Sequence, residues 1–254
     1  MKINKFARLW LLPMAMLAMG LIVGIVIGYS LNSTPLQGTI GGSVVFDMPS
    51  GVAVGPDGTL YVADSWNERI QIRSPNGTWT ILGSFGNGPG QFMYPCGVAV
   101  GPDGTLYVAD TGNHRIQIRS PKGTWTIFGG FIFPGGVAIG QDGTLFVADS
   151  YNNRIKMRSQ RDWTILGSFG NGPGQFMYPC GVAVGQDGTL YVADTGNHRI
   201  QARAPDGTWT DLGLGKLGSP YGVAVGPDGT LYVADIRGDC VQVRSPDGTW
   251  SVIG

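Results

Sequence analysis

One stretch of 23 residues occurs five times in this chain, and the repetition constrains the fold more than any other feature. The clearest copy runs from Gly97 to Arg119 and reads GVAVGPDGTLYVADTGNHRIQIR. The other copies begin at residues 51, 136, 181 and 222, so the period is 39 to 46 residues. A repeat of this length indicates similar structural units stacked side by side, each burying its apolar face against a neighbour.

Each unit has the pattern of four antiparallel strands. The apolar run Gly-Val-Ala-Val is followed by a tight Pro-Asp-Gly turn and by the β-branched and aromatic segment LYVAD. Residues 115–119 alternate polar and apolar side chains, and residues 124–128 supply a fourth strand. Four strands per repeat of this length are typical of a β-propeller blade. We therefore predict an all-β propeller over residues 51–254, with units near 51–96, 97–135, 136–180, 181–221 and 222–254.

The segment YVADTGNHRIQIR resembles the NHL repeat, in which a strand ends in Asp and a short loop with Asn-x-Arg follows. Four units keep this pattern, whereas Gly238 and Cys240 replace Asn and Arg in the fifth. The resemblance covers the chain from Gly51 onward and implies an NHL-type propeller. It implies no particular activity, because one propeller fold hosts many unrelated functions.

The Asp and Arg of this motif recur in four units, which favours a structural role over a catalytic one. A buried strand end needs its polar groups satisfied, and an Arg five residues after the Asp can hold the loop with charge-assisted hydrogen bonds. The predicted blade locks are Asp64 with Arg69, Asp110 with Arg115, Asp149 with Arg154, and Asp194 with Arg199.

The first 30 residues differ from the repeats. Lys2, Lys5 and Arg8 precede an uncharged stretch from Leu9 to Tyr29, which at 21 residues is long enough to cross a bilayer as a helix. It is also longer than the apolar region of a cleaved secretory signal. We predict a single-pass signal anchor over residues 1–30, with the N-terminus in the cytoplasm and the propeller outside. Secretion after signal cleavage is the alternative.

Residues 31–50 are a predicted linker that contains a candidate closing strand. Gln37–Gly42 aligns with Trp125–Gly130, the end of a fourth strand. Two arrangements follow. A five-blade ring would leave residues 37–46 as an extra strand or tether, whereas a truncated six-blade chain would lack the first three strands of a sixth unit and keep this segment as part of it. We favour five blades.

Positions that differ among the copies are candidates for binding. The loop after Ala-Asp and the long connections between units share one side of the propeller, here called the loop face; the Pro-Asp-Gly turns form the opposite turn face. The Gly-Val-Ala-Val runs nearest the axis offer no polar side chain. Aromatic residues often anchor interfaces, with packing between blades as the alternative. The predicted binding residues are Trp66, Glu68, Phe92, Tyr94, His114, Tyr151, Asn153, Phe176, Tyr178, His198, Arg237 and Asp239.

The resemblance brings in two kinds of propeller enzyme, the streptogramin lyases and the gluconolactonases. It implies a metal held by three histidines in the former and by Glu, Asn and Asp in the latter. This chain has two histidines, in equivalent slots two units apart, so we predict no metal and no cofactor. Its three cysteines, Cys96, Cys180 and Cys240, are predicted to be thiols.

Charge argues against nucleic acid as a partner. After the first eight residues, fourteen basic residues are spread over all units against seventeen acidic ones, and a phosphate-binding surface needs a basic patch. The predicted function is a membrane-tethered, extracytoplasmic module that binds a protein, glycan or small ligand on its loop face. The alternatives are a metal-dependent lyase or lactonase and a purely structural envelope module.

Overall fold

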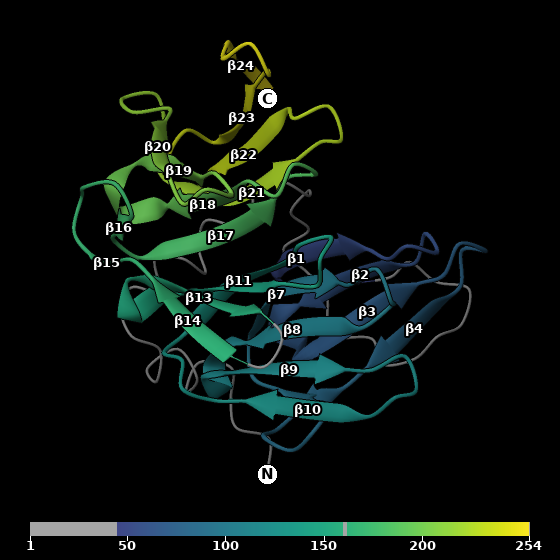
Figure 1. The fold of residues 1–254 in the computed structure, drawn as a ribbon. Helices are drawn as coiled ribbons and strands as arrows, with labels where there is room; N and C mark the ends of the chain where they lie inside the picture. Colours follow the sequence, from purple (N-terminus) through teal and green to yellow (C-terminus); the bar gives the residue numbers. More distant parts are fainter. Residues whose placement is uncertain (1–44, 160–161, 254) are drawn as a thin grey trace.

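The computed structural model describes residues 45–159 and 162–253. Five four-stranded antiparallel sheets follow one another along the chain, each with its strands in sequence order. Figure 1 shows them arranged around a common centre, with their first strands innermost. The sequence predictions of an all-β fold and of five four-stranded blades are confirmed.

The blades have closely similar bounds. Blade 1 contains β1 (Pro49–Val54), β2 (Leu60–Asp64), β3 (Arg69–Arg73) and β4 (Trp79–Leu82). Blade 2 contains β7 (Pro95–Val100), β8 (Leu106–Asp110), β9 (Arg115–Arg119) and β10 (Trp125–Phe128). Blade 3 contains β11 (Pro134–Ile139), β12 (Leu145–Asp149), β13 (Arg154–Ser159) and β14 (Asp162–Leu166). Blade 4 contains β17 (Pro179–Val184), β18 (Leu190–Asp194), β19 (Arg199–Arg203) and β20 (Trp209–Leu212). Blade 5 contains β21 (Pro220–Val225), β22 (Leu231–Asp235), β23 (Cys240–Arg244) and β24 (Trp250–Ile253).

Short secondary-structure elements lie on the loop face. A single 3-10 turn follows the second strand of blades 1 to 4, at Ser65–Asn67, Thr111–Asn113, Ser150–Asn152 and Thr195–Asn197. The two long connections each form a small parallel pair, β5 (Ser84–Phe85) with β6 (Gln91–Phe92) and β15 (Ser168–Phe169) with β16 (Gln175–Phe176).

Consecutive blades are joined by apolar clusters. Between blades 2 and 3, Ala109 and Ile116 of one blade pack with Val137 and Val147 of the next. A residue from the connection, Phe131, closes the cluster and lies edge-on to Trp163 with ring centroids 5.4 Å apart. Phe92 and Phe176 are fully buried and lie edge-on to Trp125 and Trp209 at two other junctions. These two predicted binding residues therefore lie in the core between blades, as expected from the alternative that they pack between blades.

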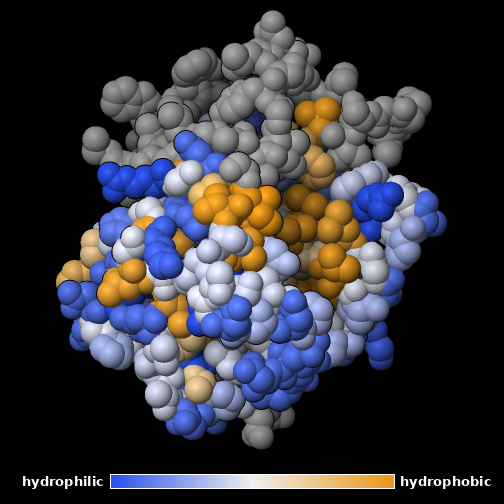
Figure 2. All heavy atoms as spheres, turned by 90° about the horizontal axis from the view of Figure 1, so that it is seen from above, coloured by the Kyte–Doolittle hydropathy of each residue, from blue (hydrophilic) through white to orange (hydrophobic). Residues whose placement is uncertain are grey.

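The junction between blade 5 and blade 1 is different. Four clusters join the four consecutive pairs of blades, and no such cluster joins β21–β24 to β1–β4 within the described ranges. Val52 of β1 is 66% exposed, whereas its equivalents Val98, Val137 and Val182 are 6 to 7% exposed. Tyr232 of β22 is exposed as well. Figure 2 shows apolar side chains gathered beside a hollow of the surface.

The predicted signal anchor and the segment 37–42 lie outside the described residues. In residues 45–159 and 162–253, no helix is both long and apolar enough to span a bilayer.

Candidate functional site at the loop face and channel mouth

The Asp at the end of each second strand organises the loop face. Asp110 is fully buried, and its carboxylate accepts hydrogen bonds from Arg115 Nε at 2.6 Å and Gln117 Nε2 at 2.9 Å. It also accepts the backbone N–H of Met93, in the connection that leads into the same blade, at 2.7 Å. The corresponding Asp–Arg distances are 2.8 Å for Asp64–Arg69, 2.8 Å for Asp149–Arg154 and 2.9 Å for Asp194–Arg199.

In blade 5 the Asp at the end of the second strand holds its loop without an Arg partner. Asp235 accepts the backbone N–H groups of Gly218 and Ser219, both at 2.7 Å, and that of Gly238 at 3.3 Å. Cys240 stands where the other blades have Arg. Here backbone donors take over the role that Arg plays in blades 1 to 4.

The fourth residue of each loop reaches across to the next blade. Glu68 accepts the N–H of Tyr94 at 2.6 Å, and Asn153 accepts that of Tyr178 at 2.8 Å. His114 Nδ1 accepts the N–H of Phe133 at 3.1 Å, while His198 Nδ1 donates to the carbonyl of Gly218. These four predicted binding residues therefore join neighbouring blades, and the described part of the chain brings no three His, Cys, Asp or Glu side chains together as a metal site.

The remaining predicted residues separate into two groups. Trp66 is half-buried and its N–H donates to the carbonyl of Asp47 at 3.1 Å, whereas Arg237 and Asp239 of blade 5 are exposed. Tyr151 and Tyr178 belong to a row of rings that crosses blades 2 to 4. The centroid distances along the row are 4.3 Å for His114–Phe133, 4.8 Å for Phe133–Tyr151 and 5.5 Å for Tyr151–Tyr178.

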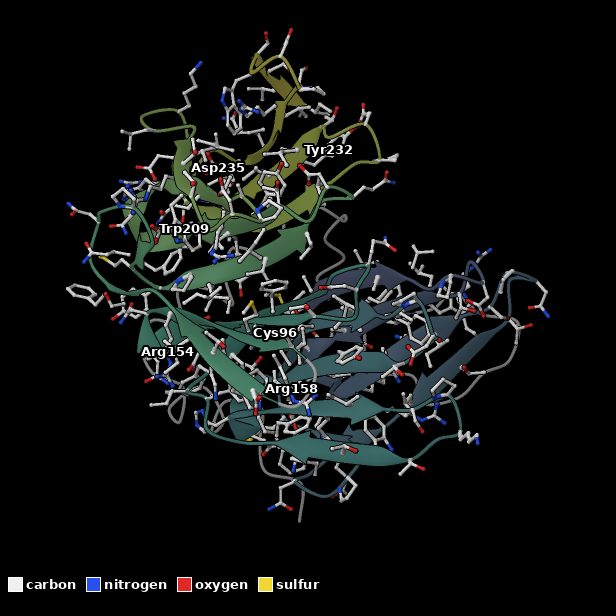
Figure 3. All side chains as sticks on the ribbon, viewed as in Figure 1. Cys96, Arg154, Arg158, Trp209, Tyr232 and Asp235 are labelled. Carbon is white, nitrogen blue, oxygen red and sulfur yellow. The ribbon has the colours of Figure 1, made fainter. Side chains whose placement is uncertain are left out.

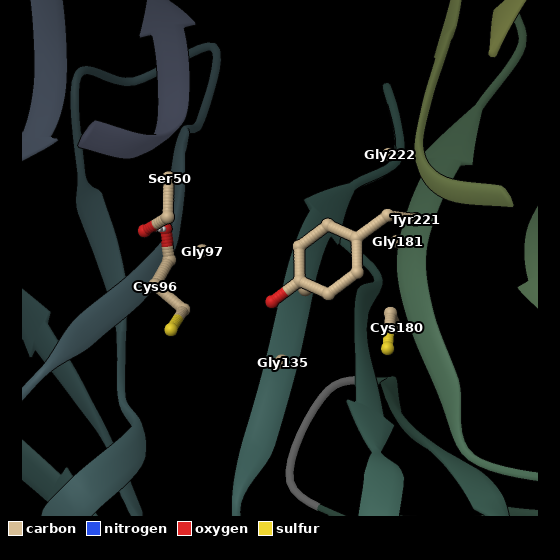
Figure 4. A pocket seen from close by; sticks show the side chains of 9 residues that line it. Ser50, Cys96, Gly97, Gly135, Cys180, Gly181, Tyr221 and Gly222 are labelled. Carbon is tan, nitrogen blue, oxygen red and sulfur yellow. Dashed lines mark hydrogen bonds between the residues drawn. The ribbon is translucent and has the colours of Figure 1, made fainter. Parts of the chain in front are cut away.

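A cavity of about 70 Å³ lies where the innermost strands begin, on the loop-face side of the axis. The second residue of each innermost strand contributes to it, and these residues are Ser50, Cys96, Gly135, Cys180 and Tyr221. Figure 4 shows both thiols turned toward the cavity, with the Tyr221 ring between them in this view. In Figure 3, Cys96 lies near the middle of the molecule and Arg154 toward its edge.

The sequence analysis missed this cavity, which we call the channel mouth. It took the innermost strands to begin at the first Gly of Gly-Val-Ala-Val, but they begin two residues earlier, at Pro49 in blade 1. The conclusion that the axis carries no polar side chain is therefore wrong. A signal was present, because the residue before that Gly differs among the units as Ser, Cys, Gly, Cys and Tyr.

Glycines bring these five positions together. A Cβ on Gly97 would lie 2.6 Å from the carbonyl oxygen of Gly135, and one on Gly136 would lie 2.7 Å from that of Cys180. Such distances are too short for any side chain, so Gly is required where one innermost strand passes the next. The close approach makes the mouth narrow.

The mouth is electrically neutral. Burial raises the pKa of the Cys180 thiol to about 12, and negative charge on Cys96 and Asp194 would raise it further. Burial also raises the pKa of Cys96 and holds that of the Tyr221 phenol well above its usual range. All three groups are therefore protonated at neutral pH. Cys96 Sγ donates to the carbonyl of Tyr94 at 3.6 Å, which is a weak bond.

One polar group at this face has no partner. The hydroxyl of Tyr151 is buried and makes no hydrogen bond within the described structure. Burial raises the pKa of Tyr151, and nearby Tyr178 and Cys180 add to the effect. The Tyr151 ring lies 5.5 Å from that of Tyr178, whose carbonyl accepts a hydrogen bond from the Cys180 thiol at 3.5 Å.

Comparison with known proteins agrees with this architecture. The NHL repeat family matches residues 46–72, 92–118, 131–156 and 176–202. The chain is an NHL-repeat β-propeller. A comparison with characterised proteins finds no significant sequence match.

Among solved structures, this NHL propeller is similar to a streptogramin B lyase, with a TM-score of 0.65 and 19% identity over 81% of this chain and 68% of that one. It is similar to a virginiamycin B lyase from Staphylococcus aureus, with a TM-score of 0.64 and 16% identity over 81% and 69% of the two chains. A gluconolactonase from Xanthomonas campestris gives 0.64 and 16% over 81% and 72%. At these identities the likeness concerns the fold alone.

Proposed function

We propose that this NHL propeller is a binding module whose ligand contacts the channel mouth and the neighbouring row of aromatic rings on the loop face. The observation that carries the proposal is the buried hydroxyl of Tyr151, which has no partner within the described structure. Leaving a buried hydroxyl unsatisfied costs about 1–3 kcal/mol. Native proteins seldom retain such a group without a role, and a ligand that bonds to it would supply the missing partner.

The two faces of the propeller differ in what they offer a ligand. On the turn face, each Pro-Asp-Gly or Gln-Asp-Gly turn is closed alike. In blade 2, Asp103 accepts the N–H of Thr105 at 3.0 Å and its hydroxyl at 2.8 Å. Blades 1, 3, 4 and 5 repeat both bonds. A uniform surface discriminates poorly, so the loop face is the better candidate for a specific partner.

The mouth also limits the ligand. Pockets for drug-sized molecules measure roughly 300–1,000 Å³, so a cavity of about 70 Å³ admits only a small group. Its lining of two thiols, a phenol and a hydroxyl is neutral and favours an uncharged group. We infer a protein side chain, glycan or small molecule that inserts a neutral tip and lays its apolar part over Tyr151 and Tyr178.

Membrane attachment is part of the proposal. The uncharged stretch Leu9–Tyr29, with its basic residues on the N-terminal side, supports a single-pass anchor and an extracytoplasmic propeller. The modest and dispersed positive charge gives no support to nucleic acid binding.

A metal-dependent lyase or lactonase is the second candidate. Its support is the fold shared with the streptogramin B lyase and the gluconolactonase. The two histidines, however, each bond to the neighbouring blade, at different junctions. A structural envelope module would need no ligand at the mouth at all.

The test replaces Tyr151 by Phe and uses Tyr107→Phe as a matched control. Tyr107 is also half-buried, but it lies beside Asp103 at the turn-face end of its strand. Because the Tyr151 hydroxyl has no partner, Tyr151→Phe should leave the melting temperature unchanged or raise it. A library of small neutral alcohols, amides and sugars is then screened by ligand-observed NMR and by protection of Cys96 from alkylation.

At least one fragment should protect Cys96 and should bind Tyr151→Phe about 2- to 10-fold more weakly, as expected for one hydrogen bond. Tyr107→Phe should bind it normally. Destabilisation by Tyr151→Phe, together with no fragment that protects Cys96, would contradict a binding site at the mouth. Turnover of a lactone or a cyclic depsipeptide by the purified protein would instead favour the enzyme.

A further inference from the structure

The fourth residue of each loop holds a junction between blades through one hydrogen bond to the connection that follows. At three junctions the donor is a backbone N–H, which belongs to the residue just before the innermost strand of the next blade. The pairs of acceptor and donor are Glu68 with Tyr94, His114 with Phe133 and Asn153 with Tyr178. All three donor residues have left-handed φ angles of 47 or 48°. An aromatic residue is strained in this conformation, so the bond that its N–H makes helps to keep it there.

The fourth junction is built the other way round. Ser219, the residue before the innermost strand of blade 5, has no left-handed φ, and its N–H donates to Asp235 at 2.7 Å. His198 therefore meets a carbonyl, that of Gly218, in place of an N–H. The two histidines occupy equivalent slots in nearly identical sequences and yet have opposite hydrogen-bonding roles.

These roles fix the protonation of the two rings. A backbone N–H can only donate, so Nδ1 of His114 must be unprotonated to accept the N–H of Phe133 at 3.1 Å. A carbonyl can only accept, so Nδ1 of His198 must carry a proton. An imidazolium donates from both nitrogens and accepts at neither. Protonation therefore breaks the contact of His114 and leaves that of His198 in place.

The groups around His114 offer no replacement for this bond. The connection that faces the ring, residues 129–133, contains no titratable side chain. At the two ends of the loop, Asp110 and Arg115 bond to each other at 2.6 Å. Across the junction lies the phenol of Tyr151, whose pKa is raised by burial, so it stays neutral. His114 itself is exposed, so protons reach it from solvent.

His198 lies in a more polar junction. The charged groups of the connection, of its own blade and of blade 5 are Lys216, Asp194, Arg199, Asp235, Arg237 and Asp239. The bond from His198 to Gly218 uses a proton that both the neutral and the charged ring can carry. None of these groups has to change for the contact to persist in acid.

We propose that His114 makes the junction between blades 2 and 3 sensitive to acid. An imidazole in water titrates at about pH 6.5, and below this range protonated His114 releases the N–H of Phe133. The Phe133 ring lies 4.3 Å from the ring of His114 and 4.8 Å from that of Tyr151, so the row of rings loses support at the same time. A ligand held over Tyr151, which belongs to the proposed function, would be bound more weakly in acid. The junction between blades 4 and 5 keeps its bond.

The direction of the effect follows from the form that makes the bond. The bond needs neutral His114, so the stability that it contributes is present above the titration of the ring and is lost as the pH falls. The chain has two histidines, and the other side chains with ordinary pKa values titrate below about pH 5 or above about pH 8. A change between these limits can therefore be assigned by substituting one histidine at a time.

The first measurement compares two amides within one molecule. Hydrogen exchange of the full-length protein in detergent is followed by NMR at about pH 7.5 and about pH 5.5, and each rate is divided by the intrinsic rate at that pH. Protection of the Phe133 N–H should fall about 2- to 10-fold relative to that of the Tyr178 N–H, the effect of one hydrogen bond. Tyr178 is the internal control, because its N–H donates at 2.8 Å to the amide oxygen of Asn153, which does not titrate. An unchanged ratio would overturn the proposal.

Substitutions by Asn separate the two histidines. Asn tolerates the left-handed φ of 58° that both histidines have, and blade 3 already uses Asn153 in this slot. His114→Asn supplies an acceptor that does not titrate, so the fall in Phe133 protection should disappear. Between the same two pH values its melting temperature should drop about 1–4 °C less than that of the wild type.

His198→Asn is the matched control and should respond to pH as the wild type does. A pH response of His114→Asn equal to that of the wild type would overturn the proposal. So would a response that is lost in His198→Asn and kept in His114→Asn. Neither measurement uses a ligand, so failure here leaves the proposed ligand site to its own test.

Discussion

Asp110→Ala should destabilise the propeller strongly, although Asp110 lies in a loop-face position. Its carboxylate is fully buried and accepts hydrogen bonds from Met93 N, Asn113 Nδ2, Arg115 Nε and Gln117 Nε2 at 2.6 to 3.1 Å. The side chain of Arg115 is only 11% exposed. Truncation would leave a nearly buried cation and a backbone N–H without their acceptor.

The magnitude follows from these contacts. Removing one partner of a buried ion pair costs about 3–5 kcal/mol, compared with about 0–1 kcal/mol for an exposed pair. We expect about 4 kcal/mol for Asp110→Ala, which corresponds to a fall in melting temperature of about 8–16 °C. Arg115→Ala should cost less, about 2–3 kcal/mol, because it leaves a carboxylate that still has other donors.

Urea unfolding of both single variants and of the double variant measures the coupling. The double variant should lose about 1–3 kcal/mol less than the sum of the single losses. Asp235→Ala provides the comparison without a cation, since among the described residues Asp235 bonds to backbone N–H groups alone. It should cost about 2–3 kcal/mol. Additive losses at 110 and 115, or equal losses at 110 and 235, would show that the ion pair does not stabilise the blade.

Two shorter predictions concern the thiols and the anchor. Burial raises the pKa of Cys180 to about 12, so alkylation of Cys180 by iodoacetamide should be slow at pH 8 and its rate should still be rising at pH 11. The same thiol in urea-unfolded protein should reach its maximum rate near pH 9–10. Equal rate profiles for the folded and unfolded protein, measured by peptide mapping, would contradict a buried thiol at the mouth. A reporter enzyme fused after Gly254 should be active only outside the cytoplasm, and a mature N-terminus near residue 30 would indicate signal cleavage in place of the anchor.

The blades could be predicted from sequence because every unit repeats the same local signals. Pro-Asp-Gly or Gln-Asp-Gly sets the turn, and the alternation in residues 115–119 sets the strand that follows the loop in unit 2. The register follows from these two signals, as the pairing of Asp110 with Arg115 across β8 and β9 shows. The exposure of Val52 could not be predicted, because Val52 has the same residue type as its buried equivalents and differs from them only in having no blade against it among residues 45–159 and 162–253.

Variation among the copies was an incomplete guide to the site. Glu68, His114, Asn153 and His198 differ in charge and size, yet each bonds to the backbone of the next blade. A backbone N–H can donate to any side chain that presents an oxygen or an unprotonated ring nitrogen, and a backbone carbonyl can accept from a side-chain N–H. This position can therefore vary while its structural role stays the same, and its variability carries little information about ligands.

The channel mouth varies for a different reason. The close approach between innermost strands is made by the glycine that follows each mouth position, as at Gly97 and Gly136. The preceding residue lines the cavity, where Ser, Cys, Gly and Tyr are all accommodated. A change at Tyr221 alters the shape and hydrogen bonding of the mouth, whereas a change at Ser50 also removes a contact between blades 1 and 2, because the Ser50 hydroxyl donates to the carbonyls of Pro95 and Cys96 at 3.3 and 3.2 Å. If the proposed ligand binds at the mouth, its selectivity could therefore be adjusted at Tyr221 independently of the blade locks.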